Sequence, residues 1–199
     1  MYLCQQILII VFYEDFSIGK FEVTQEEWEA VMGNNPSQFK GARRPVEQVS
    51  WNNCQNFINK LNKLTGMTFR PPTEAEWEFA ARGGNIGKDN DNKYAGSNRV
   101  RNVAWYSENS NLQTREVGGK DPNELGLYDM SGNVWEWCQD RYGPYNDNAQ
   151  TNPIGASSGS SRVIRGGSWI NIAIQCCITN RDYYSSSTRN TNLGFRLAL

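Results

Sequence analysis

The sequence predicts a single α+β domain in which a few short helices and strands are joined by long loops. Three observations favour this class. Capping boxes and apolar residues at three- and four-residue steps mark helices in the first half, and short apolar or alternating runs mark strands near both ends. The segments 84–114 and 140–160 are rich in Asn, Gly, Asp and Ser. With 199 residues and no internal repeat or linker, we expect one domain over residues 1–199.

The composition excludes several classes of protein. Hydrophobic residues make up 38% of the chain and aromatic residues 12%, so aromatic rings carry much of the apolar surface. The net charge of -1 gives no basic surface for nucleic acid, and no apolar run approaches the about 20 residues of a membrane span. The absence of histidine excludes His bases and His-ligated zinc or iron sites. Five cysteines, an odd number without a CxxC motif, indicate neither a disulfide framework nor a zinc site.

The first elements are two strands and a helix. Residues 7–12 are apolar, but the run is too short for a signal peptide and lacks a basic region before it, so we interpret it as a buried strand. Residues 16–23 predict a second strand. Thr24 and Glu27 occupy the ends of a capping box, so a helix is expected to start at Thr24 and to end at Gly33.

Two further helices follow. Ser50 is placed to cap an amphipathic helix, because apolar residues recur at helical spacing from there up to Gly66. Thr73 and Glu76 form a second capping box, which predicts a short helix ending near Gly83. Beyond it, the clearest strands are two short runs, residues 163–165 and 194–197.

Motifs along almost the whole chain from residue 16 onward resemble the formylglycine-generating-enzyme, or sulfatase-modifying-factor, domain. In order, they are residues 21–25 (FEVTQ) with Trp28, 45–46 with 49–51, 72–78 (PTEAEWE), 80–84 (AARGG), 126–137 (GLYDMSGNVWEW), 165–169 (RGGSW) and 192–196 (NLGFR). The resemblance implies a variant of the C-type lectin fold: a twisted antiparallel sheet with two main helices and long loops. We take Trp135, Trp137 and Trp169 as structural residues of this scaffold.

The resemblance also implies a calcium site. In the family, positions matching Asp129, Gly132, Val134 and Glu136 bind calcium through two side chains and two backbone carbonyls. That ligand set suits calcium, which takes about six to eight hard oxygen ligands, backbone carbonyls included. The alternative is a Gly-Asn turn in which Glu136 pairs with an arginine. A second family site is matched more loosely, by Asn102 and Val103.

The oxidases of this family hold copper(I) with two cysteines that follow the Gly-Gly-Ser motif. Counted from Ser168, the first of these positions falls on Asn171, which has no thiolate, and Cys176 matches the second only with a shift in spacing. We therefore expect no copper and interpret Cys176 as a small buried hydrophobic residue. The family's sulfoxide synthases take iron ligands from histidines, which this chain lacks.

The segment 170–191 has an unusual composition. Sixteen of its 22 residues are Asn, Ile, Thr, Asp, Tyr or Ser, a set that belongs to no structural class. It is, however, the set reached by changing one adenine of an asparagine codon. This pattern resembles the variable region of a protein diversified by a diversity-generating retroelement. Such a retroelement introduces mutations at adenines into the 3′ end of a gene whose product has a C-type lectin fold. Tyr and Ser together are also typical of antibody paratopes.

We therefore predict a non-enzymatic ligand-binding protein with a variable face, whose partner is a variable macromolecule, in the first instance a protein. Display on a cell surface or virus particle would suit this function, although no export signal is seen. The alternatives are a formylglycine-generating oxidase that acts on a sulfatase cysteine, and an unvaried partner domain in which the segment is a Ser/Thr loop with a buried strand. The predicted face comprises Ile170, Asn171, Ile172, Ile174, Ile178, Thr179, Asn180, Asp182, Tyr183, Tyr184, Ser185, Ser186, Ser187, Thr188, Asn190 and Thr191.

Overall fold

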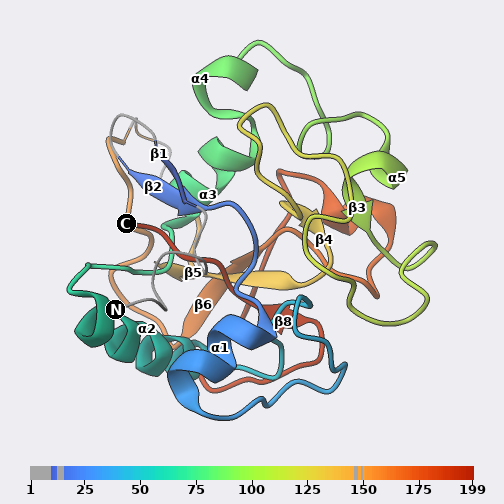
Figure 1. The fold of residues 1–199 in the computed structure, drawn as a ribbon. Helices are drawn as coiled ribbons and strands as arrows, with labels where there is room; N and C mark the ends of the chain where they lie inside the picture. Colours follow the sequence, from blue (N-terminus) through green and yellow to red (C-terminus); the bar gives the residue numbers. More distant parts are fainter. Residues whose placement is uncertain (1–9, 13–15, 146–147, 149) are drawn as a thin grey trace.

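The computed structural model describes residues 10–12, 16–145, 148 and 150–199 (Figure 1). Helix α1 (Gln25–Met32) begins after Thr24, whose side chain accepts a hydrogen bond from the Glu27 N–H, and ends at Gly33 in the left-handed conformation. The predicted capping box and stop signal are both confirmed. They work locally, because the Thr side chain satisfies a backbone donor that has no partner within the helix.

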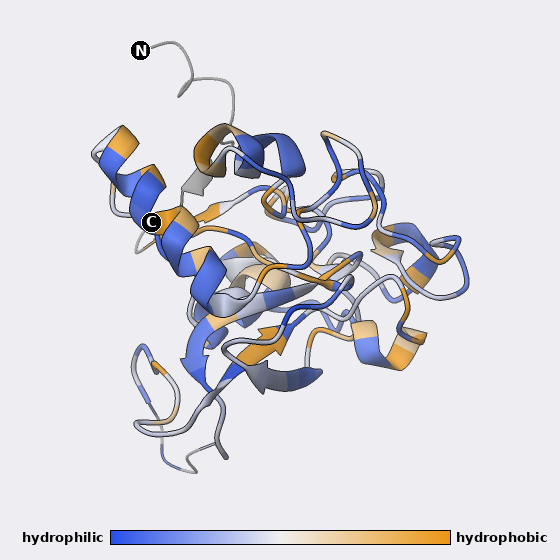
Figure 2. Cartoon of the chain, turned by 90° about the horizontal axis from the view of Figure 1, so that it is seen from below, coloured by the Kyte–Doolittle hydropathy of each residue, from blue (hydrophilic) through white to orange (hydrophobic). Residues whose placement is uncertain are grey.

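Helices α2 (Trp51–Thr65) and α3 (Glu74–Ala81) also begin where the sequence predicts, after Ser50 and Thr73. Helix α2 is amphipathic, and the side seen from below is mostly hydrophilic (Figure 2). Its other side buries four residues against the sheet: Cys54, Phe57, Ile58 and Leu61. Among the described residues, no helix is long and apolar enough to cross a membrane.

The main sheet has four strands in the order β7-β6-β5-β8. Strand β6 (Ser161–Arg165) pairs antiparallel with both β5 (Trp135–Arg141) and β7 (Arg181–Ser185). The last strand, β8 (Leu193–Gly194), pairs parallel with β5. The expected antiparallel sheet therefore holds for three strands, while the fourth runs parallel because the chain returns to β5 after a long connection.

Shorter elements surround this sheet. Strand β1 (Ile10–Phe12) pairs with β2 (Ser17–Gly19), which confirms part of the predicted N-terminal strand; residues 7–9 and Cys4 lie outside the described residues. A second small pair joins β3 (Ala104–Trp105) to β4 (Ser131–Gly132). The loops also contain three helical turns, which are α4 (Gly84–Gly87), α5 (Val100–Val103) and the 3-10 turn η1 (Ala173–Cys176).

The core lies on both sides of β5. Trp135 and Trp137 are 3% and 0% exposed and pack with α1 and α2, whereas Cys138 packs with Trp77 of α3. Trp169 is 6% exposed, so all three tryptophans taken as structural are buried. Both faces of β5 are buried, but one of them carries Glu136 and Asp140, so the strand shows neither a continuous apolar run nor alternation with a solvent-facing side.

Candidate ligand-binding surface

Two fixed segments border residues 170–191. The first, residues 165–169, leaves β6 through Gly166 and Gly167, both with positive φ. A Cβ on Gly167 would lie 2.7 Å from the Gln175 carbonyl oxygen and 2.9 Å from the Cys176 Cα. The Gly-Gly pair therefore allows the chain to fold back tightly, so that η1 packs against the end of β6.

The second border is joined directly to the first. The Trp169 Nε1–H donates to the Thr191 carbonyl oxygen at 3.0 Å. Its ring also meets Phe39 edge to face, with centroids 5.4 Å apart. Trp169 thus ties together the two ends of the 22-residue segment, and the residues between them form a closed loop on the scaffold.

Most of the predicted face reaches solvent. Ile170, Ile172, Ile174 and Tyr183 are 51%, 60%, 55% and 47% exposed, high values for large apolar side chains. Four more are also exposed, namely Thr179, Asp182, Ser185 and Ser187. Seven are partly exposed: Asn171, Asn180, Tyr184, Ser186, Thr188, Asn190 and Thr191.

Ile178 is a correction to the predicted face. Its side chain is 1% exposed and packs in the core with Trp77 and Val163. Its N–H donates to the Lys93 carbonyl oxygen, and its own carbonyl accepts from Arg165 at 2.8 Å. Ile178 is therefore an anchor of the segment, and composition alone could not separate it from the exposed isoleucines.

The secondary structure of the segment also differs from expectation. The alternating isoleucines at 170, 172 and 174 suggested one side of a strand, but this stretch contains η1, which lies beside α5 and β3 (Figure 1). The strand is instead β7, whose side chains are partly or fully exposed. Most of its side chains are exposed, so β7 shows no apolar alternation, although Tyr184 packs against Trp137.

The cysteines of the segment are buried. Cys176 is 0% exposed, and burial raises the pKa of its thiol to about 12. Asn171 stands near it, held by hydrogen bonds to the Ser168 hydroxyl and the Gln175 side chain. A copper(I) site needs thiolates, whereas the two positions counted from Ser168 supply one cysteine, Cys176, and the amide of Asn171.

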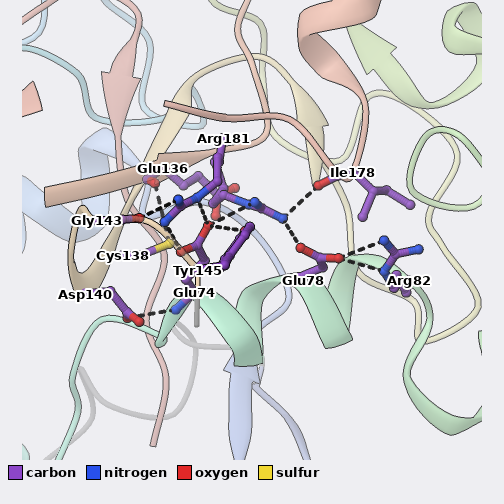
Figure 3. A network of polar contacts seen from close by, with 11 residues as sticks. Glu74, Glu78, Arg82, Glu136, Cys138, Asp140, Gly143, Tyr145, Ile178 and Arg181 are labelled. Atoms are coloured by element: carbon purple, nitrogen blue, oxygen red, sulfur yellow. Dashed lines mark hydrogen bonds and ion pairs between the residues drawn. The ribbon is translucent and has the colours of Figure 1, made fainter. Parts of the chain in front are cut away.

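Arg181 is the residue of this surface that sequence reasoning missed. It lies at the start of β7 and makes two hydrogen bonds to the Glu74 carboxylate, of 2.7 and 2.6 Å (Figure 3). Its guanidinium also lies over the rings of Tyr142 and Tyr145, at 4.5 and 4.2 Å from their centroids. The only sequence signal was that Arg181 departs from the Asn-derived set.

The Glu74 carboxylate is also bound by a second arginine, Arg165. Arg165 is fully buried and donates to Glu74 at 3.0 Å, to Glu78, and to the Ile178 carbonyl. Arg165 and Arg181 thus meet on one glutamate of α3. This network fixes β7 to the scaffold through charged hydrogen bonds, which are stronger than neutral ones.

The predicted metal residues lie in a separate buried cluster. Glu136 accepts from Arg196 through Nε at 2.7 Å and Nη2 at 2.6 Å, and from the Trp77 Nε1–H at 2.7 Å. An arginine therefore does pair with Glu136, as the alternative interpretation expected. Asp129 accepts one bond from the Gly118 N–H, and its second oxygen, Oδ1, is buried without a partner.

Glu22 adds a third buried carboxylate, which the sequence analysis did not include. It accepts hydrogen bonds from Asn133 Nδ2 and the Val134 N–H. Burial raises its pKa well above the usual range, and the charges of Asp129 and Glu136 raise it further. Burial likewise raises the pKa of Asp129 to about 6. The charge of Arg196 lowers both pKa values but does not offset burial.

The ligand chemistry of this cluster is compatible with calcium. A carboxylate has about four lone-pair sites, and the three bonds to Glu136 leave acceptor capacity on Oε1. Asp129 Oδ1 has no other partner. Within the described ranges no three Cys, Asp or Glu side chains form a metal cluster by themselves. Calcium binding would therefore depend on the Gly132 and Val134 carbonyls as well. Asn102 and Val103 of the second predicted site lie on α5.

Known proteins are similar to this chain in sequence and in architecture. The family model of the sulfatase-modifying factor enzyme 1-like domain matches residues 9–199. The chaperone protein LppX of Paenibacillus barcinonensis is 35% identical over 206 residues, covering 78% of this chain and 70% of that protein. The formylglycine-generating enzyme of Streptomyces coelicolor is 35% identical over 201 residues, covering 86% of this chain and 60% of the enzyme.

A solved structure, Treponema denticola variable protein 1, superposes with a TM-score of 0.86 at 35% identity, covering 96% of this chain and 91% of that one. It is a variable protein of a diversity-generating retroelement with a C-type lectin fold. The expected α+β fold of the C-type lectin type is thereby confirmed. With the family model matching nearly the whole chain, the protein belongs to the sulfatase-modifying factor enzyme 1-like family.

Proposed function

We propose that the protein is a non-enzymatic ligand-binding protein and that the exposed part of residues 170–191 is its binding surface. One observation carries the proposal: this segment has large apolar side chains that are about half exposed, while other residues of the same segment fix its backbone to the core. Cys176 and Ile178 are buried, and Arg181 is bound to Glu74. Such a surface permits substitution of the exposed residues without loss of the fold, as recognition of varied ligands requires.

The similarity to Treponema denticola variable protein 1 supports this function, because the match extends over nearly the whole of both chains. We further propose that the surface is diversified by adenine mutagenesis. The residues that composition assigns to altered asparagine codons are mostly exposed, whereas Cys176 and Cys177, which lie outside that set, are buried. Selection would keep the buried residues fixed, because changes there create cavities or unpaired groups.

The diversification is tested at the gene. Beside a reverse-transcriptase gene, we expect a template repeat nearly identical to the coding sequence of residues 170–191 and differing from it at adenines. Copies from related strains should vary at the exposed positions and should keep Cys176, Ile178 and Arg181. A segment with no such template, and with substitutions spread evenly over the chain, would exclude diversification and leave an unvaried partner domain.

The family membership keeps a second candidate open, an oxidase that forms formylglycine from a sulfatase cysteine. Titration with copper(I), followed by an assay on a cysteine-containing sulfatase peptide, separates the two functions. Because Asn171 replaces a thiolate and Cys176 is buried, we expect no stoichiometric copper binding and no turnover. Copper binding that is lost in Cys176→Ser, together with turnover, would overturn the proposed function.

We also propose that calcium binds between Asp129 and Glu136, with the carbonyls of Gly132 and Val134. Bound calcium would offset the excess negative charge of the buried carboxylates. A ligand that binds only the folded state at about 100 times its Kd stabilises it by about 2.7 kcal/mol. We therefore expect calcium to raise the Tm of the protein and a chelator to lower it, measured by differential scanning calorimetry.

The variant Asp129→Gly isolates this site, since glycine accepts the backbone φ of 58° at this position but supplies no ligand. Its Tm should no longer respond to calcium. The matched control Asp91→Gly removes an exposed carboxylate and should keep the full response. An equal calcium response in all three proteins would place the effect elsewhere and contradict the site.

A further inference from the structure

A leucine outside residues 170–191 has an unusual conformation. Leu112 is 68% exposed, and it follows Asn111 in a turn where both residues have positive φ, 57° and 56°. A left-handed backbone costs an L-residue about 1–2 kcal/mol, and asparagine adopts it more readily than leucine. An exposed leucine gains little from packing in return. Both the positive φ and the exposure of Leu112 are therefore unfavourable for the stability of the fold.

This turn is attached to the binding surface. Ser110 Oγ accepts from the Leu112 N–H at 3.2 Å and donates to the Trp169 carbonyl oxygen at 2.8 Å. The Ser107 N–H donates to the Asn171 carbonyl oxygen at 3.0 Å. The loop of residues 107–112 therefore runs beside residues 169–171, and one hydroxyl links the backbone of Leu112 to the residue before Ile170.

The surroundings combine exposed aliphatic side chains with charged side chains that already have partners. Ile170, Ile172 and Ile174 are each more than half exposed, and residues 166–180 contain no charged side chain. In the adjoining loop, Glu108 is bound by Arg101 at 2.9 Å and by the Tyr106 hydroxyl at 3.0 Å, and Arg115 Nε donates to the Ser110 carbonyl oxygen at 2.8 Å. We call Leu112, Ile170, Ile172 and Ile174 the aliphatic patch.

We propose that Leu112 is a fixed part of the binding surface and that the aliphatic patch binds apolar side chains of a protein partner. The inference rests on the proposed ligand-binding function. The charged side chains beside the patch already have partners: Arg101 binds Glu108, and Arg115 donates to the Ser110 carbonyl. A charged ligand would therefore lose water here without meeting a free ion of opposite charge. Aliphatic or aromatic side chains instead gain by burying the exposed leucine and isoleucines.

The test is selection of peptides from a phage-displayed random library on the immobilised wild-type protein. Enriched peptides should be rich in aliphatic and aromatic residues. We expect their affinity to fall about tenfold or more, equivalent to about 1.4 kcal/mol, for Leu112→Asn and for Ile172→Asn. The control Leu64→Gln removes a leucine that is 71% exposed at the end of α2, and it should bind as the wild type does.

The Tm of Leu112→Asn shows whether its loss of affinity could come from misfolding. Because asparagine is better suited to a positive φ, Leu112→Asn should melt at or above the wild-type Tm. Polar peptides, or peptides that bind Leu112→Asn as well as the wild type but lose affinity for Tyr183→Ser, would overturn the role of the patch and leave the proposed function standing. Peptides indifferent to every substitution in residues 170–191 would count against the proposed function itself.

Discussion

Replacement of Arg196 by methionine is expected to unfold the protein or to lower its free energy of unfolding by about 3–5 kcal/mol, the usual cost of breaking a buried ion pair. Arg196 is 0% exposed and makes two hydrogen bonds to Glu136. It also donates to the Gly19 and Tyr128 carbonyls, both at 2.9 Å. Its loss leaves three buried carboxylates, Glu22, Asp129 and Glu136, with no cation among them.

Urea unfolding followed by tryptophan fluorescence measures this cost. The matched control is Arg101→Met, which removes an ion pair whose side chains are 66% and 60% exposed and which should change stability by less than about 0.5 kcal/mol. If Arg196→Met does not fold, Arg196→Lys keeps the charge but loses the paired contact and should be intermediate. Equal stability of Arg196→Met and Arg101→Met would show that Arg196 does not neutralise the cluster.

The parts of this fold that could be predicted from sequence are those fixed by neighbouring residues. The capping boxes at Thr24 and Thr73 act over three residues, and both helices begin where they predict. Strand β5 could not be predicted, because its two faces are buried by helices from distant parts of the chain. Periodicity reports burial on one face, and it disappears when both faces are covered.

The proposed binding surface divides in the same way. Its residues were predicted from composition, and fifteen of the sixteen are exposed or partly exposed, whereas Ile178 is buried. Its anchors were not predicted, since Glu74 meets Arg165 and Arg181 across 91 and 107 residues of sequence. The role of Leu112 depends on a positive φ and on the hydroxyl of Ser110. Both are properties of the folded backbone, which residue types do not specify.

Replacement of Trp169 by alanine is expected to cost about 3–5 kcal/mol of folding free energy, as for other buried aromatic residues. Beyond its packing against Phe39, Trp169 holds the two ends of residues 170–191 together through the Thr191 carbonyl. We therefore expect Trp169→Ala to loosen the whole segment, and hydrogen exchange should show reduced protection of the β7 amides before global unfolding.

The comparison with Ile172→Ser makes this result specific to the scaffold. Ile172 is 60% exposed, so its loss should change stability by less than about 0.5 kcal/mol. Tyr183→Ser should fall between them, since the ring lies 4.3 Å from that of Tyr142 and such pairs contribute about 0.5–1.5 kcal/mol. If thermal melts ranked Ile172→Ser as more damaging than Trp169→Ala, the exposed residues would be supporting the fold. The segment would then not be free to vary, and the division into fixed anchors and a binding surface would be wrong.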